Sequence, residues 1–221
     1  HDTESFTEEI ENIIYALEWH TMAVELVSKQ MNLNHITPAE IYEKLCEQGI
    51  SASKEKIKHL KDGTLRNRNS LNHIEVLFSV FNLSENLKQI LKHIALIGSV
   101  QIDRIYFLCI CGFGEQEIDC LNTAVQGGWI QLYEKDFYIH PLIAEALCSQ
   151  IDTTTESCEK LILNLTEVAE HIDYFQADYR FLHEIILYHV GKHLSGDNQL
   201  TAYFYFNLSL VYQKIYDSIS K

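Results

Sequence analysis

Histidine is the residue type in this chain best suited to acid–base or metal chemistry, and the sequence holds eleven of them. His189 and His193 are four residues apart, a spacing that places two side chains on one face of a helix. A zinc protease would need the pattern H-E-x-x-H, and the segment H-V-G-K-H lacks the glutamate. We therefore interpret these histidines as structural or solvent-facing side chains, with adventitious metal binding as the alternative, and predict no metal site.

The six cysteines show neither a metal-binding nor a disulfide pattern. Cys109 and Cys111 are separated by one residue, and no second closely spaced pair follows them. Most of the six lie in apolar helical patterns such as Y-F-L-C-I-C-G-F, where a free thiol behaves as a small buried hydrophobe. The acidic N-terminus lacks the apolar stretch of a signal peptide. These features favour a reduced, cytoplasmic protein.

Phosphate-binding loops are absent from the sequence in both common forms, G-x-x-x-x-G-K-[ST] and G-x-G-x-x-G. No set of possible nucleophiles, acids and bases converges at a recognisable spacing. The sequence therefore predicts a chain that is not itself an enzyme and that holds no cofactor of its own. It begins with His1 rather than methionine, which favours a fragment of a longer protein.

Charge argues against nucleic acid and against membranes as partners. The formal net charge is −14, so no overall positive field attracts phosphate backbones or anionic lipid. One basic stretch, residues 54–68, holds six of the 17 lysines and arginines. Its interpretation as a solvated face is favoured over a phosphate-binding surface. The longest apolar run, residues 105–114, is shorter than the roughly 20 residues that a membrane-spanning helix needs.

Apolar periodicity predicts a first, helical domain over residues 1–66. Helices are expected over residues 5–18, 20–31, 37–48 and 53–60. The third begins with Thr37, Pro38 and Glu40, which together form a capping signature: a threonine cap, a proline in the first helical position and a glutamate three residues after the cap.

Residues 67–151 are predicted to form a winged-helix domain. Helices are expected over residues 69–81, 84–97, 102–111 and 116–126. Gly127 and Gly128 then lead into a hairpin with strands over residues 129–133 and 137–139, and Pro141 opens one more helix. The expected recognition helix, residues 114–126, holds three acidic residues and no lysine or arginine, which speaks against insertion into a DNA groove.

Residues 152–221 are predicted to form a third, helical region. Helices over residues 156–172, 177–194 and 198–220 are long, and the last is rich in tyrosine and phenylalanine. This pattern suits the start of a tetratricopeptide-like array, in which each repeat buries its apolar face against the next. The predicted fold class is therefore mainly α, with one short β-hairpin.

Two short segments carry a resemblance to one known family. They are His20 to Leu26, H-T-M-A-V-E-L, and Tyr138 to Ile143, Y-I-H-P-L-I. The first resembles the G-L-P-L-A-L-E-L helix that follows the ATPase core in the NB-ARC class of STAND signal-transduction ATPases. The second resembles the M-H-D or I-H-P-L motif that ends the winged-helix domain of that family. The likeness in organisation covers residues 5–151.

The resemblance implies a nucleotide-sensing role for two positions. His140 matches the motif histidine, which in the family reaches the β-phosphate of bound ADP and holds the inactive state closed. Thr21 takes the place of the family's proline near the adenine, and Trp19 takes the place of the glycine. ADP or ATP would then be bound by an upstream ATPase domain of the parent protein. The alternative is that His140 only caps or packs at the strand–helix junction.

Three functional hypotheses follow. The first is a regulatory arm that couples the nucleotide state of an upstream ATPase domain to protein partners bound by the C-terminal helices. The second is a transcriptional regulator whose winged helix binds DNA. The third is a stand-alone helical module for protein–protein interaction.

Overall fold

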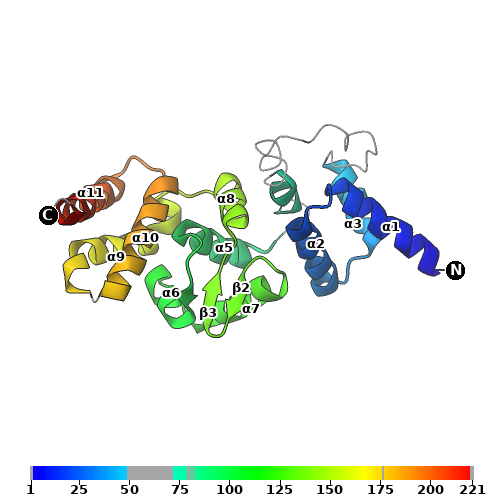
Figure 1. Ribbon diagram of the computed structural model, residues 1–221, viewed down its shortest axis with the longest axis horizontal. Helices are drawn as coiled ribbons and strands as arrows, with labels where there is room; N and C mark the ends of the chain where they lie inside the picture. Colours follow the sequence, from blue (N-terminus) through cyan, green and yellow to red (C-terminus); the bar gives the residue numbers. More distant parts are fainter. Residues whose placement is uncertain (1, 49–71, 79–80, 82, 176, 220–221) are drawn as a thin grey trace.

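The computed structural model describes residues 2–48, 72–78, 81, 83–175 and 177–219. These residues form an elongated molecule in which three groups of elements follow one another along the long axis (Figure 1). Helices dominate, and one small antiparallel sheet lies in the middle group. The predicted helix over residues 53–60, the basic stretch 54–68 and the expected boundary between residues 66 and 67 lie outside the described residues.

The first group consists of α1 (Asp2–Ala16), α2 (Thr21–Asn34) and α3 (Pro38–Glu47), with α1 packed against α3. The helix α1 begins a turn earlier than the sequence predicts. The predicted cap of α3 is confirmed, since Thr37 and Glu40 exchange the two hydrogen bonds of a capping box. Between α1 and α2, Glu18 and Trp19 take left-handed backbone conformations, with φ of 51° and 59°. This tight turn reverses the chain and places His20 at the start of α2.

The middle group is centred on α5 (Glu85–Ile97), which begins at the predicted Ser84 cap and ends at Gly98. Every residue from Ile90 to Ile97 is buried. Around it lie α6 (Arg104–Cys111), the 3-10 turn η2 (Glu115–Glu117), α7 (Ile118–Gln126) and α8 (Pro141–Gln150). The helix α5 contacts both α7 and α8, so it forms the shared core of the group.

The prediction of one helix over residues 102–111 is wrong at its start. Ile102 and Asp103 form the strand β1 (Ile102–Asp103), and α6 begins only at Arg104. The Asp103 carboxylate accepts hydrogen bonds from the backbone N–H groups of Ile105 and Tyr106, which makes it the N-cap of α6. An N-cap residue has an extended backbone, so the residues before Arg104 are free to pair as a strand.

The hairpin is present but shorter than predicted, with strands β2 (Gln131–Tyr133) and β3 (Asp136–Tyr138). Three strands pair antiparallel in the order β1-β3-β2, and Phe137 lies opposite both Ile102 and Leu132. Trp129 and Ile130, expected in the first strand, precede it and are buried in the core. Phe78 and Phe81 pack edge-on against the buried indole of Trp129.

The third group contains η3 (Glu156–Cys158), α9 (Glu159–Glu170), η4 (Ile172–Tyr174), α10 (Ala177–His193) and α11 (Gln199–Ile219). The predicted helix over residues 156–172 is therefore shorter, with a 3-10 turn on each side. One face of α11 packs on α9 and α10 through Phe204, Leu208 and Val211. The group joins the middle one where α10 meets α5 and α9 meets α6.

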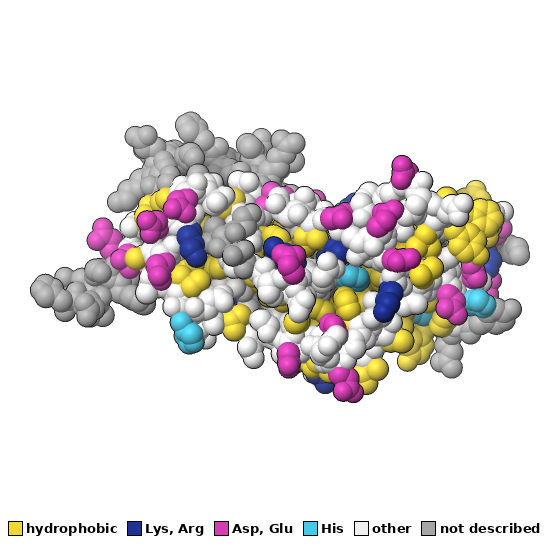
Figure 2. All heavy atoms as spheres, turned by 180° about the vertical axis from the view of Figure 1, so that it is seen from behind, with side chains coloured by type: hydrophobic (Ala, Val, Ile, Leu, Met, Phe, Trp, Pro, Cys, Tyr) yellow, Lys and Arg dark blue, Asp and Glu magenta, His cyan; other side chains and the backbone are white. Residues whose placement is uncertain are grey.

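Apolar and aromatic side chains remain exposed at the C-terminal end of the molecule. Figure 2 shows them gathered over this end, which lies at the right of that view. On α11 they are Tyr203, Tyr205, Phe206, Leu210, Tyr212 and Tyr216. No helix among the described residues combines the length and the apolar composition that crossing a bilayer requires.

Candidate functional site

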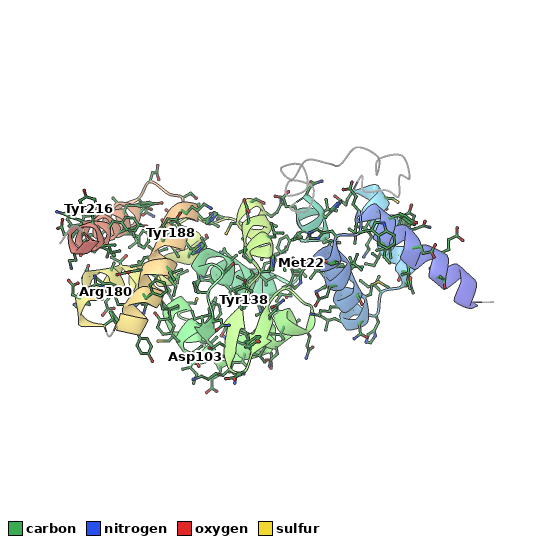
Figure 3. All side chains as sticks on the ribbon, viewed as in Figure 1. Met22, Asp103, Tyr138, Arg180, Tyr188 and Tyr216 are labelled. Atoms are coloured by element: carbon green, nitrogen blue, oxygen red, sulfur yellow. The ribbon has the colours of Figure 1, made fainter. Side chains whose placement is uncertain are left out.

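The two residues singled out by the sequence, Thr21 and His140, line one pocket. Its volume is about 170 Å³, and it lies between the first turn of α2, the segment that enters β2 and the first turn of α8. Figure 3 labels Met22 on the side of α2 that faces the middle group. The complete lining is Thr21, Met22, Glu25, Leu26, Gly128, Trp129, Gln131, His140 and Ile143.

His140 is held in place by the hairpin and by the start of α8. The strand β3 ends at Tyr138, Ile139 is fully buried, and His140 is the N-cap of the helix that Pro141 opens. Its Nδ1 accepts a hydrogen bond of 3.2 Å from the backbone N–H of Leu142. In the neutral ring the proton must then sit on Nε2, which leaves this nitrogen as a donor. Burial, together with a smaller effect of His20, lowers the pKa of His140 and favours that neutral form.

The start of α2 repeats this arrangement with His20. Its Nδ1 accepts from the backbone N–H of Ala23 at 3.2 Å, and burial lowers its pKa. His20 lies near enough to influence the pKa of both His140 and the buried His73. No role for His20 was predicted from the sequence. Its position directly before an apolar-periodic helix was the available indication, although histidine is not among the usual N-cap residues.

The helix α2 reaches the hairpin through the glycine pair before Trp129. The side-chain amide of Gln30 donates to the carbonyl oxygen of Gly127 at 2.7 Å, and both groups are buried. Gly128 has a φ of +82°, and a Cβ there would lie 2.7 Å from Cδ of Lys29. Glycine is therefore needed for its left-handed backbone and for the close approach of α2. This contact, between residues far apart in the sequence, brings Thr21 to the same pocket as His140.

Residues from two helix N-termini contribute to the lining of the pocket. The first N–H groups of a helix have no acceptor within the helix, and Thr21, Met22 and Ile143 hold such positions in α2 and α8. The N-terminal, positive ends of two helix dipoles therefore lie beside the same pocket. The single carboxylate in the lining, that of Glu25, is paired with Lys29 at 2.7 Å. Such a pocket suits an anion better than a cation.

The other candidates from the sequence form no comparable site. His189 and His193 are partly buried on α10, and burial lowers the pKa of each. Cys111 and Cys158 are buried as predicted, whereas Cys46 and Cys109 are exposed, so the prediction of buried thiols is wrong for those two. Within the part of the chain that the structure describes, no three histidine, cysteine or acidic side chains gather in an arrangement that could hold a metal ion.

A second pocket, of about 380 Å³, lies between α6 and α9. The Asn164 side chain donates to the carbonyl oxygen of Ile110 at 2.9 Å beside it, which ties the two helices together. Its lining is mainly apolar and includes Tyr106, Val168 and Phe175.

Comparison with known proteins adds no relative: no protein-family model matches the chain, and neither curated proteins nor solved structures gave a match.

Proposed function

We propose that this chain is the regulatory arm of a STAND-type signalling ATPase, with α1–α3 as a helical lid and the middle group as a winged-helix domain. The order of the elements in the middle group supports this proposal. A helix, a strand, two helices and a hairpin follow one another along the chain, as in a winged helix. The sheet order β1-β3-β2 agrees with it. On this proposal α9–α11 are the start of a helical-repeat region that binds protein partners.

One observation carries the proposal: Thr21 and His140 line the same pocket. The resemblance in sequence assigns both residues to one nucleotide, yet they belong to different groups of the fold. The docking of α2 on the glycine pair brings the two positions together.

The chemistry of the pocket supports a phosphate as the group that is sensed. The neutral His140 ring donates through Nε2, and the free N–H groups of α2 and α8 add donors. A hydrogen bond to a charged oxygen is stronger than one between neutral groups, so the bond matters most when phosphate is present. ADP held by the upstream domain of the parent would favour the docked arrangement of lid and winged helix. Exchange for ATP would shift the population towards a released arm.

The test is substitution of His140 in the full-length parent. His140→Ala removes both the cap of α8 and the imidazole donor, whereas His140→Ser keeps an N-cap oxygen and removes the imidazole Nε2–H donor. Both variants are expected to release ADP faster and to raise basal signalling activity. The measurement is the fraction of ADP that remains bound after gel filtration. The control is His35→Asn, because His35 is exposed and asparagine tolerates its left-handed backbone.

Two outcomes would count against the proposal. Unchanged ADP retention in both variants would exclude a sensor role for His140. Full retention in His140→Ser but not in His140→Ala would assign the residue to helix capping alone.

The exposed aromatic residues of α11 favour a second candidate function, protein–protein interaction through the C-terminal helices. Tyrosine and phenylalanine are enriched at interfaces because they bury a large area with little loss of side-chain freedom. We expect Phe206→Ser combined with Leu210→Ser to reduce self-association or partner binding without unfolding the chain, which sedimentation velocity can measure. Unchanged association in that variant would contradict a role for this face of α11.

DNA binding receives less support from the structure. The helix α7 carries Asp119 and no lysine or arginine, and it follows Glu115 and Glu117 in η2. Among the described residues on the face shown in Figure 2, lysine and arginine side chains lie singly, with acidic side chains near them. A helix with this charge would be repelled by the phosphates that border a DNA groove.

A further inference from the structure

We propose that the second pocket, between α6 and α9, is a binding site for a small organic cation, a protonated amine carried on an apolar body. The site lies where the middle and C-terminal groups meet (Figure 1). It shares no lining residue with the pocket that His140 lines, so it does not depend on the proposed sensing of phosphate. Pockets that hold whole small molecules usually measure roughly 300–1,000 Å³, and the volume of about 380 Å³ falls within this range.

The aromatic rings of Tyr106 on α6 and Phe175 after η4 line the pocket. The buried ring of His183 on α10 contacts both, with Nε2 at 2.6 Å from the Tyr106 hydroxyl and its centroid 4.3 Å from that of Phe175. Burial lowers the pKa of His183, so this ring stays neutral and brings no positive charge behind the aromatic wall. Aromatic rings attract cations, and these two are held in place by their contacts with His183.

The polar side chains of the lining offer acceptors and a negative charge. Glu167 supplies a carboxylate, and neither lysine nor arginine occurs among the described residues that line the pocket. The side-chain nitrogen of Asn164 donates to the carbonyl oxygens of Cys109 and Ile110, which leaves its side-chain oxygen as an acceptor. A protonated amine would therefore find partners here, whereas a carboxylate or phosphate would be repelled by Glu167.

The last turns of two helices contribute to the same lining. Cys109 and Ile110 belong to the last turn of α6, and Glu167 and Val168 belong to the last turn of α9. The C-terminal end of a helix is the negative end of its dipole, because the last carbonyl groups have no partner within the helix. Two such ends beside one pocket favour a cation over an anion.

The apolar part of the lining excludes an inorganic cation. Ile110 and Val168 offer no side-chain ligand to a metal ion, and no three histidine, cysteine or acidic side chains gather to hold one in the described part of the chain. An amine attached to an aromatic or aliphatic body would use both parts of the lining, since its body buries apolar surface while its charged end meets Glu167.

The test follows the reactivity of Cys109, an exposed thiol of the lining, in the complete chain. Alkylation by iodoacetamide is measured by mass spectrometry at increasing concentrations of a probe, and the exposed Cys46 on α3 is the internal control. The probes are 2-phenylethylamine, the neutral 2-phenylethanol, the anionic 3-phenylpropionate, and ethylamine, which lacks the ring.

We expect 2-phenylethylamine to slow the alkylation of Cys109 until the effect saturates, and to leave Cys46 unchanged. The alcohol should need a roughly three- to tenfold higher concentration, because it lacks the charge that the carboxylate, the helix ends and the rings attract. Ethylamine and 3-phenylpropionate should not protect Cys109.

Glu167→Gln removes the charge and keeps an oxygen acceptor in a side chain of the same size. It is expected to weaken binding of the amine about two- to fivefold, as for the loss of an exposed ion pair, and to leave binding of the alcohol unchanged. The matched control is Glu159→Gln, which makes the same change of charge at an exposed position in the first turn of α9. Phe175→Leu keeps the wall apolar and should reduce the preference for the amine over the alcohol. Thermal unfolding checks that each variant is folded.

Three outcomes would overturn the inference. Protection of Cys109 by 3-phenylpropionate as strong as that by 2-phenylethylamine would exclude a cation site. Equal slowing of alkylation at Cys109 and Cys46 would show that the probes do not act in this pocket, and no protection by any probe would exclude the site itself. None of these results concerns ADP retention in the His140 variants, so the proposed function is tested separately.

Discussion

Gln30 on α2 donates its side-chain amide to the carbonyl oxygen of Gly127 at 2.7 Å, and this bond joins two groups of elements across a buried contact. The side-chain oxygen of Gln30 in turn accepts a hydrogen bond of 3.0 Å from Asn34. Gln30 is only 1% exposed, so neither its amide nor the carbonyl group of Gly127 can form a hydrogen bond with water instead. The bond therefore contributes to the position of α2, and through it to the position of Thr21 in the pocket.

We expect Gln30→Ala to destabilise the chain by about 1–3 kcal/mol, because the carbonyl of Gly127 would remain buried without its donor. Urea unfolding followed by circular dichroism measures this change. The control is Gln116→Ala, since Gln116 is exposed and its side-chain amide donates to the neighbouring Glu117. Equal effects of the two substitutions would show that the Gln30 bond does not hold α2 on the hairpin.

Gly128→Ala is expected to disturb the same contact between α2 and the glycine pair, in this case through backbone strain and a steric clash. Alanine is strained at a φ of +82°, and its Cβ would come within 2.7 Å of Lys29. A loss of about 1–2 kcal/mol is expected, together with displacement of α2. Gly114→Ala is the matched control, because the backbone there has a negative φ and the nearest atom to a Cβ is a flexible carboxylate oxygen at 3.5 Å. A melting temperature that falls equally in both variants would contradict this account.

Much of the fold could be predicted from local sequence, because its helix boundaries are set by side chains close in the chain. The Thr37 capping box, the Ser84 cap, Gly98 and Pro141 each act within one turn of their helix. The strand β1 could not be found in this way. It is two residues long, and its partner Phe137 lies more than thirty residues later in the chain, so only tertiary pairing distinguishes it from the start of α6.

The site was predictable only in part. His140 could be located from the hairpin and the proline after it, both local features. Its meeting with Thr21 depends on Gln30 and Gly127, which nothing in the sequence relates to each other. Trp129 was expected in a strand and is instead buried beside the pocket, because the left-handed Gly128 turns the chain before β2 begins.

Two phenylalanines on α11 differ in burial: one lies in the core of the C-terminal group and the other on its exposed face. Phe204 is fully buried and Phe206 is 58% exposed, although they are two residues apart on one helix. Phe204→Ala is expected to cost about 3–5 kcal/mol through the cavity it leaves. Phe206→Ala should change the free energy of unfolding by less than about 0.5 kcal/mol. Chemical unfolding of both variants tests the packing of α11, and a large effect of Phe206→Ala would show that this face is covered.

The buried ring of His93 on α5 is expected to make the stability of the chain depend on pH. Burial lowers its pKa from 6.5 to about 4, against a smaller opposing effect of its hydrogen bond to the Gln89 carbonyl oxygen at 2.7 Å. The unfolded chain therefore takes up a proton at a higher pH than the folded chain does. Stability from the neutral ring is complete above about pH 6.5 and is lost as the pH falls towards about 4, by on the order of 3 kcal/mol in total.

Substitution of His93 isolates this effect from that of the other histidines. His93→Gln keeps an amide donor at the position but does not titrate, so the fall in unfolding free energy between pH 7 and pH 4 should be smaller by on the order of 3 kcal/mol than in the unsubstituted chain. The exposed His35, changed to asparagine, which tolerates the left-handed backbone there, is the control and should leave the pH dependence as it is. If His93→Gln and the unsubstituted chain lose stability in parallel as the pH falls, the ring must be able to take up its proton in the folded state at an ordinary pH. The packing of Phe113 against it, with ring centroids 4.7 Å apart, would then have to open in mild acid.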